Sequence, residues 1–127
     1  MIYGVGTDIV EVGRIEKALA RFGDRFAKRI LCDPELKRFQ NHRQKANYLA
    51  KRFAAKEAFT KALGTGIHAP ANWHGVWVKN LPSGKPVLEF SDPLKLLLDK
   101  RGISNSHLSL ADERGMAVAT VILECEK

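Results

Sequence analysis

The first residues of the chain alternate in the manner of a β-strand. Over residues 2–10, the even-numbered side chains would lie on one face and the odd-numbered side chains on the other, because strand side chains alternate. Both faces are largely apolar, and this pattern predicts an interior strand. Asp8 is then an unexpected residue in it.

A helical spacing replaces the alternation after residue 11. Apolar residues recur at three- and four-residue steps, namely Val12, Ile15, Leu19, Phe22, Phe26 and Ile30. Gly23-Asp24 is expected to divide this stretch into two helices, with Asp24 as an N-cap. Asp33-Pro34 predicts the N-cap and first residue of a further helix that ends near Asn41.

The longest helix is predicted over residues 44–63, ending at Gly64. Strands are predicted over 73–81, 86–90, 107–111 and 116–124, and one more helix begins at Ser91-Asp92-Pro93 and ends at Gly102. The last two strands would form a hairpin. This order predicts an α+β fold, with helices packed on one mainly antiparallel sheet.

Length and charge narrow the class of protein. A chain of 127 residues is expected to form a single domain, 1–127, whose small core makes oligomerisation a natural way to bury more surface. The formal net charge of +7 favours an anionic partner: a nucleic acid, a membrane surface, a phosphate-rich cofactor or an acidic protein.

Two cysteines, Cys32 and Cys125, make neither a disulfide framework nor a zinc site. We expect both to be reduced thiols in the cytosol. The chain shows no signal peptide pattern and no apolar run of transmembrane length, so a cytoplasmic protein without a membrane partner is expected.

Two segments carry the candidate chemistry: Gly-Val-Gly-Thr-Asp-Ile-Val-Glu-Val-Gly-Arg at 4–14 and Arg-Phe-Ala-Ala-Lys-Glu-Ala-Phe-Thr-Lys at 52–61. They place Asp8 near a strand end and Glu57 on a helix, and such a pair of carboxylates suits Mg²⁺ bound to a phosphate ester. Each residue also has an ordinary structural explanation. Asp8 would cap a turn. Glu57 and Lys61, four residues apart, would form a surface ion pair, which spacing alone favours.

Other basic residues and histidines are open to two interpretations. Lys56 lies in an apolar stripe, where a lysine either extends its stem toward water or reaches a buried anion, and extension toward water is the default expectation. Gly84-Lys85-Pro86 is first a hairpin turn, although its lysine could reach a phosphate. His107 is expected to make structural hydrogen bonds at the start of an interior strand. The other histidines show no metal-binding pattern.

A basic ridge is predicted on the first helical region. If that helix were continuous, Arg14, Arg21, Arg25 and Lys28 would fall within a sector of about 60°, at 100° per residue. An acidic protein helix or a polyphosphate would fit such a ridge.

Taken together, these segments resemble a known family. Residues 6–15 and 52–62, with Gly84-Lys85-Pro86 and His107-Leu108-Ser109-Leu110, are similar in order and separation to the motifs of the holo-acyl-carrier-protein synthases. These are the short bacterial class of 4′-phosphopantetheinyl transferases. The resemblance covers nearly the whole chain. One departure is Ala111-Asp112, where many relatives carry Ser-His.

The resemblance implies a fold equivalent to half of the longer two-domain transferases, assembled as a homotrimer with coenzyme A in clefts between subunits. The reaction would transfer phosphopantetheine from coenzyme A to a serine of apo-acyl carrier protein and release adenosine 3′,5′-bisphosphate. The proton acceptor for the serine would be either Glu57 or a water molecule on the metal.

The resemblance also implies roles for individual residues. Asp8 and Glu57 would bind Mg²⁺, and Lys61, with Lys56 as a second candidate, would face the pyrophosphate. The adenosine and 3′-phosphate contacts would come from Arg52, Gly84, Lys85, Pro86 and His107. The acidic carrier protein would dock on Arg14, Arg21 and Arg25.

Two other functions fit parts of the pattern. A metal-dependent nuclease would also use carboxylates, lysines and positive charge, but aromatic residues do not alternate with the basic ones as in stacking platforms. A non-catalytic nucleic-acid-binding module would leave Asp8 and Glu57 unexplained and would bind with a steep salt dependence. The transferase interpretation therefore predicts no nucleic-acid partner, and binding of coenzyme A rather than DNA distinguishes it from both alternatives.

Overall fold

The structure of the chain is a computed structural model that describes residues 1–126. Helices and strands follow one another in the order β1 (Ile2–Glu11), α1 (Val12–Phe22), α2 (Asp24–Ile30), α3 (Asp33–Gln40), α4 (Lys45–Leu63), β2 (Val76–Asn80), β3 (Pro86–Phe90), α5 (Asp92–Lys100), β4 (Ile103–Glu113) and β5 (Met116–Cys125). The predicted α+β class is confirmed. Cys32 and Cys125 are both free thiols.

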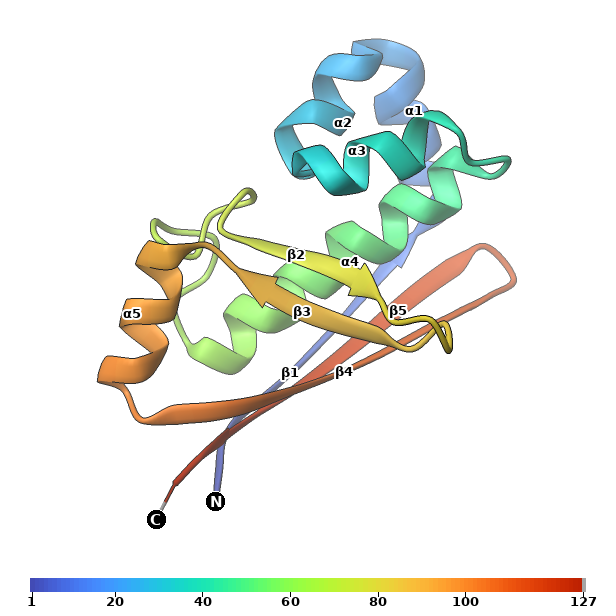
Figure 1. Cartoon of the computed structure of the whole chain (residues 1–127). Helices are drawn as coiled ribbons and strands as arrows, with labels where there is room; N and C mark the ends of the chain where they lie inside the picture. Colours follow the sequence, from blue (N-terminus) through green and yellow to red (C-terminus); the bar gives the residue numbers. More distant parts are fainter. Residues whose placement is uncertain (127) are drawn as a thin grey trace.

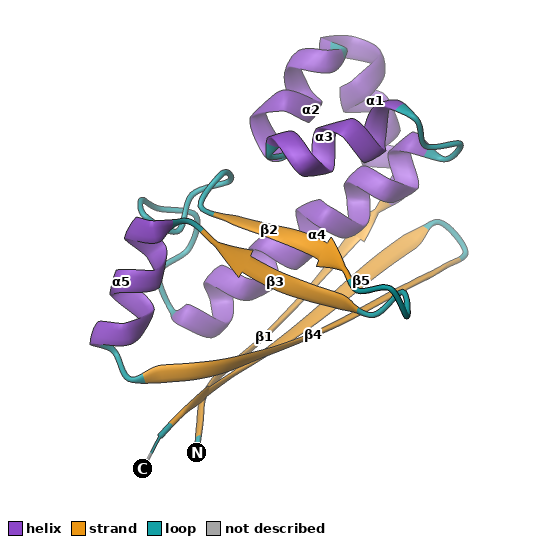
Figure 2. Cartoon of the chain, viewed as in Figure 1, coloured by secondary structure: helices purple, strands orange, loops and turns teal. Residues whose placement is uncertain are grey.

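Helix α4 lies at the centre of the molecule, and the strands wrap around it (Figure 1). An antiparallel sheet in the order β1-β5-β4 covers one side of α4. The antiparallel pair β2-β3 forms a second sheet that lies across α4, and β3 lies beside β4. Helices α1, α2 and α3 gather at one end and α5 at the other (Figure 2). The expectation of a single sheet is therefore wrong. Directly after β3, Ser91 caps helix α5. This helix separates the β2-β3 hairpin from β4 along the chain.

The two outer strands of the three-stranded sheet, β1 and β4, are edge strands, and this corrects a second expectation. β1 and β4 were predicted to be interior strands, but each pairs only with β5. On the outward face of β1, Val5 is 55% exposed and Ile9 is 59% exposed. The apolar residues on both faces were correctly recognised, yet a single copy of the chain covers only one of the faces.

The two backbones of β1 and α4 touch each other. A Cβ atom on Gly6 would lie 1.9 Å from the carbonyl oxygen of Ala58, and one on Gly4 would lie 2.0 Å from that of Ala62. Real Cβ atoms never come so close to an oxygen, so only glycine fits at these two positions. The glycines of the first motif therefore bring Asp8 beside the helix of the second motif.

Several helix ends follow the sequence signals, with small shifts. Gly64 ends α4 in the left-handed conformation, with φ 89°, and Ser91 accepts a hydrogen bond from the backbone of Leu94 as the N-cap of α5. Gly23 rather than Asp24 is the N-cap of α2. Cys32 rather than Asp33 is the N-cap of α3, because the Glu35 carboxylate accepts the backbone N–H of Cys32 at 3.0 Å in a capping box.

Lys56 is fully buried, which contradicts the expectation that its stem extends to water. Its ammonium donates to the carbonyl of Ile30 at 2.6 Å, to that of Trp73 at 2.7 Å and to the carboxylate of Glu35 at 2.7 Å. The other oxygen of Glu35 accepts the backbone N–H of Val78 at 2.9 Å. These contacts join α2, α3, α4 and β2 in the core, and burying this charge is tolerated because all three of its donors are used.

The same geometry corrects the assignment of Lys56 to a pyrophosphate. Its side chain is 0% exposed, and its three hydrogen bonds leave it no donor for a substrate. Lys56 is thus a structural residue of the core.

Candidate active site

Asp8, Glu57 and Lys61 form the first group of candidate functional side chains. The ammonium of Lys61 donates to the Asp8 carboxylate at 3.1 Å and to the backbone carbonyl of Thr7 at 3.0 Å. Lys61 thus makes its ion pair with Asp8 on β1, whereas spacing alone had favoured a pair with Glu57. The two sequence motifs meet at this point.

Glu57 lies close enough to this pair for its acidity to change. Partial burial is the main cause that raises the pKa of Glu57, and the negative charge of Asp8 raises it further, while Lys61 lowers it. A cation bound beside Glu57 and Asp8 would favour the charged form of Glu57.

This pair of carboxylates fits a magnesium ion. The described residues contain no group of three or more His, Cys, Asp or Glu side chains arranged for a metal. Two carboxylates with the remaining ligands from phosphate and water are what Mg²⁺ takes in phosphate-ester enzymes.

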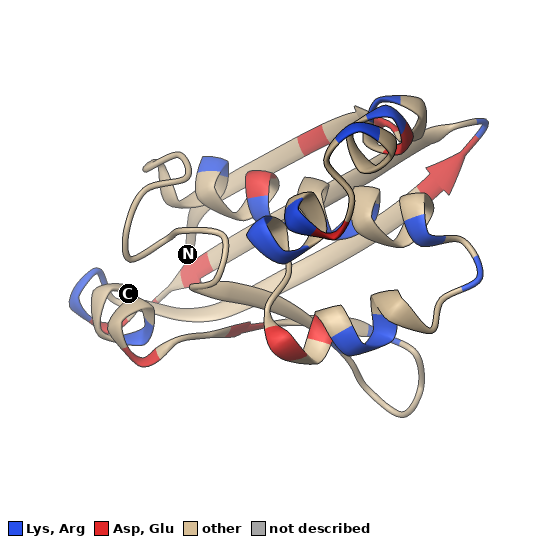
Figure 3. Cartoon of the chain, turned by 90° about the horizontal axis from the view of Figure 1, so that it is seen from above, with Lys and Arg blue, Asp and Glu red and all other residues tan. Residues whose placement is uncertain are grey.

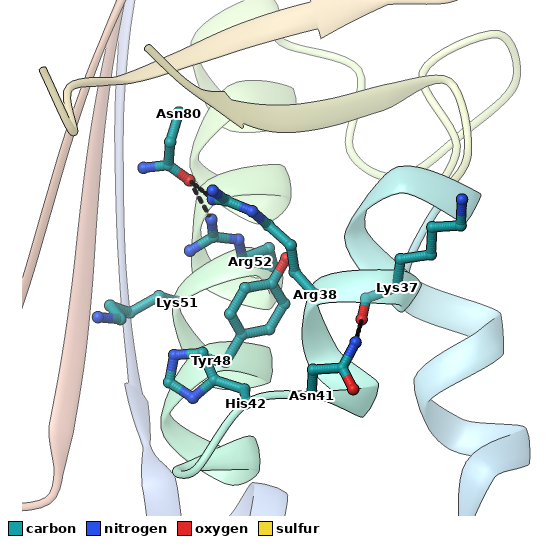
Figure 4. Close-up of a pocket in the computed structure, with 8 residues that line it drawn as sticks. All are labelled: Lys37, Arg38, Asn41, His42, Tyr48, Lys51, Arg52 and Asn80. Atoms are coloured by element: carbon teal, nitrogen blue, oxygen red, sulfur yellow. Dashed lines mark hydrogen bonds between the residues drawn. The ribbon is translucent and has the colours of Figure 1, made fainter. Parts of the chain in front are cut away.

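A basic pocket of about 610 Å³ lies beside α3 and the N-terminal half of α4 (Figure 4). It is lined by Lys37, Arg38, Asn41, His42, Tyr48, Lys51, Arg52 and Asn80. No carboxylate is among these lining residues, so the pocket suits an anion.

Arg52 is the buried member of this pocket. It is 5% exposed, its guanidinium lies 4.1 Å from the centre of the Tyr48 ring, and it donates to the side-chain oxygen of Asn80 at 2.8 Å. Asn80 in turn donates to the carbonyl of Gly84 at 3.0 Å. The structure thus connects Arg52 with the predicted Gly84-Lys85-Pro86 turn, which joins β2 to β3 and leaves Lys85 exposed.

His107 is not part of either group within one chain. The neighbouring Leu108 is opposite buried Val121, whereas His107 is opposite Ile122, so His107 points away from α4 on the outward face of the sheet. There it lies 2.6 Å from the carboxylate of Glu124 and donates to it. The expected structural hydrogen bond is therefore present.

The basic ridge is interrupted. Gly23 takes a φ of 63° between α1 and α2, so the continuous helix that the angular argument assumed does not form. Arg14 and Arg21 lie on α1, and Arg25 and Lys28 lie on α2; all four are exposed. Figure 3 shows that basic positions are frequent on the helices at this end, with acidic positions among them.

One arginine of the ridge lies next to the carboxylate site. Arg14 and Asp8 both line a hollow of about 320 Å³ whose other walls are mainly apolar, among them Phe26 and Phe53. A partner bound on α1 would therefore lie beside Asp8.

Sequence reasoning did not identify Glu35, Arg38 or Asn80. Glu35 follows the helix start by two residues, and this N3 position of a capping box could have drawn attention to it. Arg38 and Asn80 carry no such signal, because a surface arginine and an asparagine at a strand end are common. None of the helices among the described residues has the length and apolar character that crossing a bilayer requires.

Comparison with known proteins gives consistent results along the whole chain. A family model for the 4′-phosphopantetheinyl transferase superfamily matches residues 4–121. The holo-[acyl-carrier-protein] synthase of Aliivibrio salmonicida is 51% identical over 123 residues, which cover 97% of this chain and 98% of that protein.

Solved structures agree. The holo-[acyl-carrier-protein] synthase of Neisseria meningitidis superposes with a TM-score of 0.95 at 44% identity and covers 98% of this chain and 99% of its own. The enzyme of Bacillus anthracis, solved in complex with coenzyme A (3′,5′-ADP), gives a TM-score of 0.84 at 38% identity and covers 99% of both chains.

Proposed function

The chain belongs to the holo-[acyl-carrier-protein] synthases of the 4′-phosphopantetheinyl transferase superfamily, and we propose that it transfers phosphopantetheine from coenzyme A to a serine of apo-acyl carrier protein with the aid of Mg²⁺. The observation that carries this proposal is the meeting of Asp8, Glu57 and Lys61 between β1 and α4. The relatives favour this reaction over a nuclease or a nucleic-acid-binding module.

Asp8 and Glu57 are the residues that would hold the metal. When bound, Mg²⁺ would neutralise negative charge on the phosphate oxygens of the substrate. The raised pKa of Glu57 supports this role, because a cation beside the two carboxylates would relieve their mutual repulsion.

Lys61 would act on the pyrophosphate. Its side chain is 52% exposed and has one ion-pair partner, Asp8, so the ammonium can turn toward a bound phosphate. In a phosphoryl transfer of this kind, negative charge grows on the leaving oxygen, and a cation held beside it stabilises the transition state more than the ground state.

Lys61→Ala is therefore expected to lower kcat by roughly a hundredfold and to change KM for coenzyme A by less than about threefold. Steady-state kinetics with varied coenzyme A would measure both constants. An unchanged kcat with only a raised KM would instead make Lys61 a residue that binds substrate and transition state equally.

The nucleotide end of coenzyme A would bind further along α4. Arg52 lies in the basic pocket, and Asn80 connects it with the turn that carries Gly84, Lys85 and Pro86. We assign the adenosine and 3′-phosphate contacts to this group. His107 lies on the other side of the three-stranded sheet, so it would join the nucleotide site of a second subunit.

The outward face of the three-stranded sheet supports a homotrimer. Val5 and Ile9 on β1 are exposed there, and Val118 and Ile122 on β5 point the same way, opposite Ile9 and Val5. An apolar sheet face of this kind is typical of a subunit interface.

We expect sedimentation equilibrium to show a trimer at micromolar concentration. Val5→Lys together with Ile9→Lys should shift the protein toward monomer, because two charges would have to be buried in the interface. A wild-type protein that sediments only as a monomer would contradict the trimer and, with it, the role of His107 in a neighbouring site.

The exposed arginines Arg14, Arg21 and Arg25 would bind the acidic carrier protein. The break at Gly23 changes the shape of this surface but leaves Arg14 and Arg21 on one helix, with Arg14 beside Asp8. The carrier serine would thus be presented next to the carboxylates.

Arg14→Glu combined with Arg21→Glu should raise KM for apo-acyl carrier protein at least about tenfold and barely change the affinity for coenzyme A. Because exposed charges are screened by salt, added salt should weaken the wild-type interaction with the carrier and largely spare the double variant. Equal salt sensitivity of the two proteins would show that the carrier docks elsewhere. Glu16→Gln on the same helix serves as a charge control.

A direct assay tests the proposed function itself. Purified protein, coenzyme A, Mg²⁺ and apo-acyl carrier protein should give carrier whose mass has increased by one phosphopantetheine group, together with adenosine 3′,5′-bisphosphate. The reaction should stop when a chelator removes the metal. Unchanged carrier mass in the complete mixture would rule the proposal out.

A further inference from the structure

Asn80 holds two arginines together in the basic pocket. Its side-chain oxygen accepts hydrogen bonds from Arg38 at 2.7 Å and from Arg52 at 2.8 Å, and its amide nitrogen donates to the carbonyl of Gly84 at 3.0 Å. Figure 4 shows the side-chain oxygen of Asn80 pointing toward the ends of both guanidinium groups, with a dashed line to each. Three elements, α3, α4 and β2, therefore meet at one amide.

The two guanidinium groups lack the partners that arginines usually have. Neither Arg38 nor Arg52 forms a salt bridge with any described carboxylate, whereas Lys51 in the same pocket pairs with Asp112 at 3.6 Å. The Nε atom of Arg52 is buried and has no hydrogen-bond partner among the described residues. Buried donors without partners are rare in proteins, and the Arg52 side chain that carries this one lines the pocket.

Electrostatics point to the same conclusion. Burial is the main cause that lowers the pKa of Arg52; Tyr48 and Glu35 raise it, and the positive charge of Arg38 lowers it with the smallest effect. A bound dianion would favour both charged guanidinium groups and would accept their free N–H groups, since guanidinium groups bind phosphate oxygens in pairs.

We propose that Asn80 is a positioning residue that holds Arg38 and Arg52 as a paired clamp for a phosphate monoester, and that Arg38 is the second arm of this clamp. This inference rests on the proposed function for the identity of the ligand, the 3′-phosphate of coenzyme A. Asn80 and Arg38 then determine the preference for coenzyme A over the same molecule without that phosphate, 3′-dephospho-coenzyme A.

The first experiment compares these two donors. Asn80→Leu removes the shared acceptor at nearly constant size, and Arg38→Gln removes one arm. Each should raise KM for coenzyme A roughly tenfold to a hundredfold, leave kcat within about twofold, and leave KM for 3′-dephospho-coenzyme A within about twofold. A purely structural role of Asn80 would affect both donors equally, and that result, or no change with either donor, would overturn the proposal.

Two further variants make the test specific. Lys79→Gln removes a positive charge from the neighbouring position of β2, outside the clamp, and should leave the preference between donors unchanged. Asn80→Asp retains an acceptor for both arginines but adds a negative charge. It should keep the wild-type melting temperature and still raise KM for coenzyme A alone, so the test survives if Asn80→Leu fails to fold.

A binding experiment separates this inference from the proposed function. Isothermal titration of the wild-type protein should show tighter binding of adenosine 3′,5′-bisphosphate than of adenosine 5′-monophosphate, and Asn80→Leu should remove most of the difference. This holds even if no transferase activity is found, a result that would contradict the proposed function alone. Equal affinity of the wild-type protein for the two nucleotides would contradict the clamp.

Discussion

Asp8→Ala and Glu57→Ala are each expected to lower the rate of phosphopantetheine transfer by at least about a thousandfold without unfolding the protein. Both carboxylates would be needed to hold the proposed cation, so neither would replace the other. Asp8→Ala would also release Lys61, whose ammonium donates to that carboxylate at 3.1 Å. Loss of Asp8 would therefore affect the proposed metal and the lysine together.

The measurement is transfer rate against Mg²⁺ concentration, with thermal unfolding of each variant as the check on folding. Asp8→Asn and Glu57→Gln keep the side-chain size and should be nearly as inactive, because a neutral amide is a poor ligand for Mg²⁺. Asp99→Ala, an exposed carboxylate on α5, is the control and should be fully active. Near-normal turnover of both alanine variants would refute the metal assignment.

Lys56→Met is expected to lower the free energy of unfolding by about 3–5 kcal/mol, the usual cost of removing one partner of a buried ion pair. Methionine fills a similar volume but donates nothing. The Glu35 carboxylate and the carbonyls of Ile30 and Trp73 would then lose a hydrogen bond each.

Urea denaturation would measure this loss. Adding Glu35→Gln to Lys56→Met should recover part of it, because the buried charge disappears while an acceptor remains for Val78. Lys51→Met is the matched control on the same helix; its ion pair with Asp112 is partly exposed and should contribute less than about 1 kcal/mol. Similar losses for Lys51→Met and Lys56→Met would show that the core pair is not a major source of stability.

Local patterns predicted most of the secondary structure but not how the sheets are arranged. The end of α4 at Gly64 and the cap of α5 at Ser91 depend on residues within one turn, so the sequence is enough. The separation of β2-β3 from the other strands depends on contacts with α4, which no local pattern contains. The apolar outward face of β1 was visible in the sequence, whereas its exposure in a single chain was not.

The candidate site was likewise predicted only in part from local sequence patterns. Asp8, Glu57 and Lys61 stand in recognisable motifs, and the structure brings them together. Lys56 was misjudged because its partner, Glu35, lies on another helix, and a helical wheel shows only one helix. The angular argument for the basic ridge assumed a continuous helix, whereas the division expected at Gly23-Asp24 is present, with Gly23 at a φ of 63°.

The contact of Gly4 and Gly6 with the carbonyl oxygens of Ala62 and Ala58 has a consequence for how this enzyme can evolve. The distance from β1 to α4 is fixed by main-chain atoms in contact, with no side chain between them. Core residues elsewhere can therefore change in volume over generations without altering the separation of Asp8 from Glu57. Divergent homologues can thus inherit the same spacing of these two carboxylates in cores built from different apolar residues.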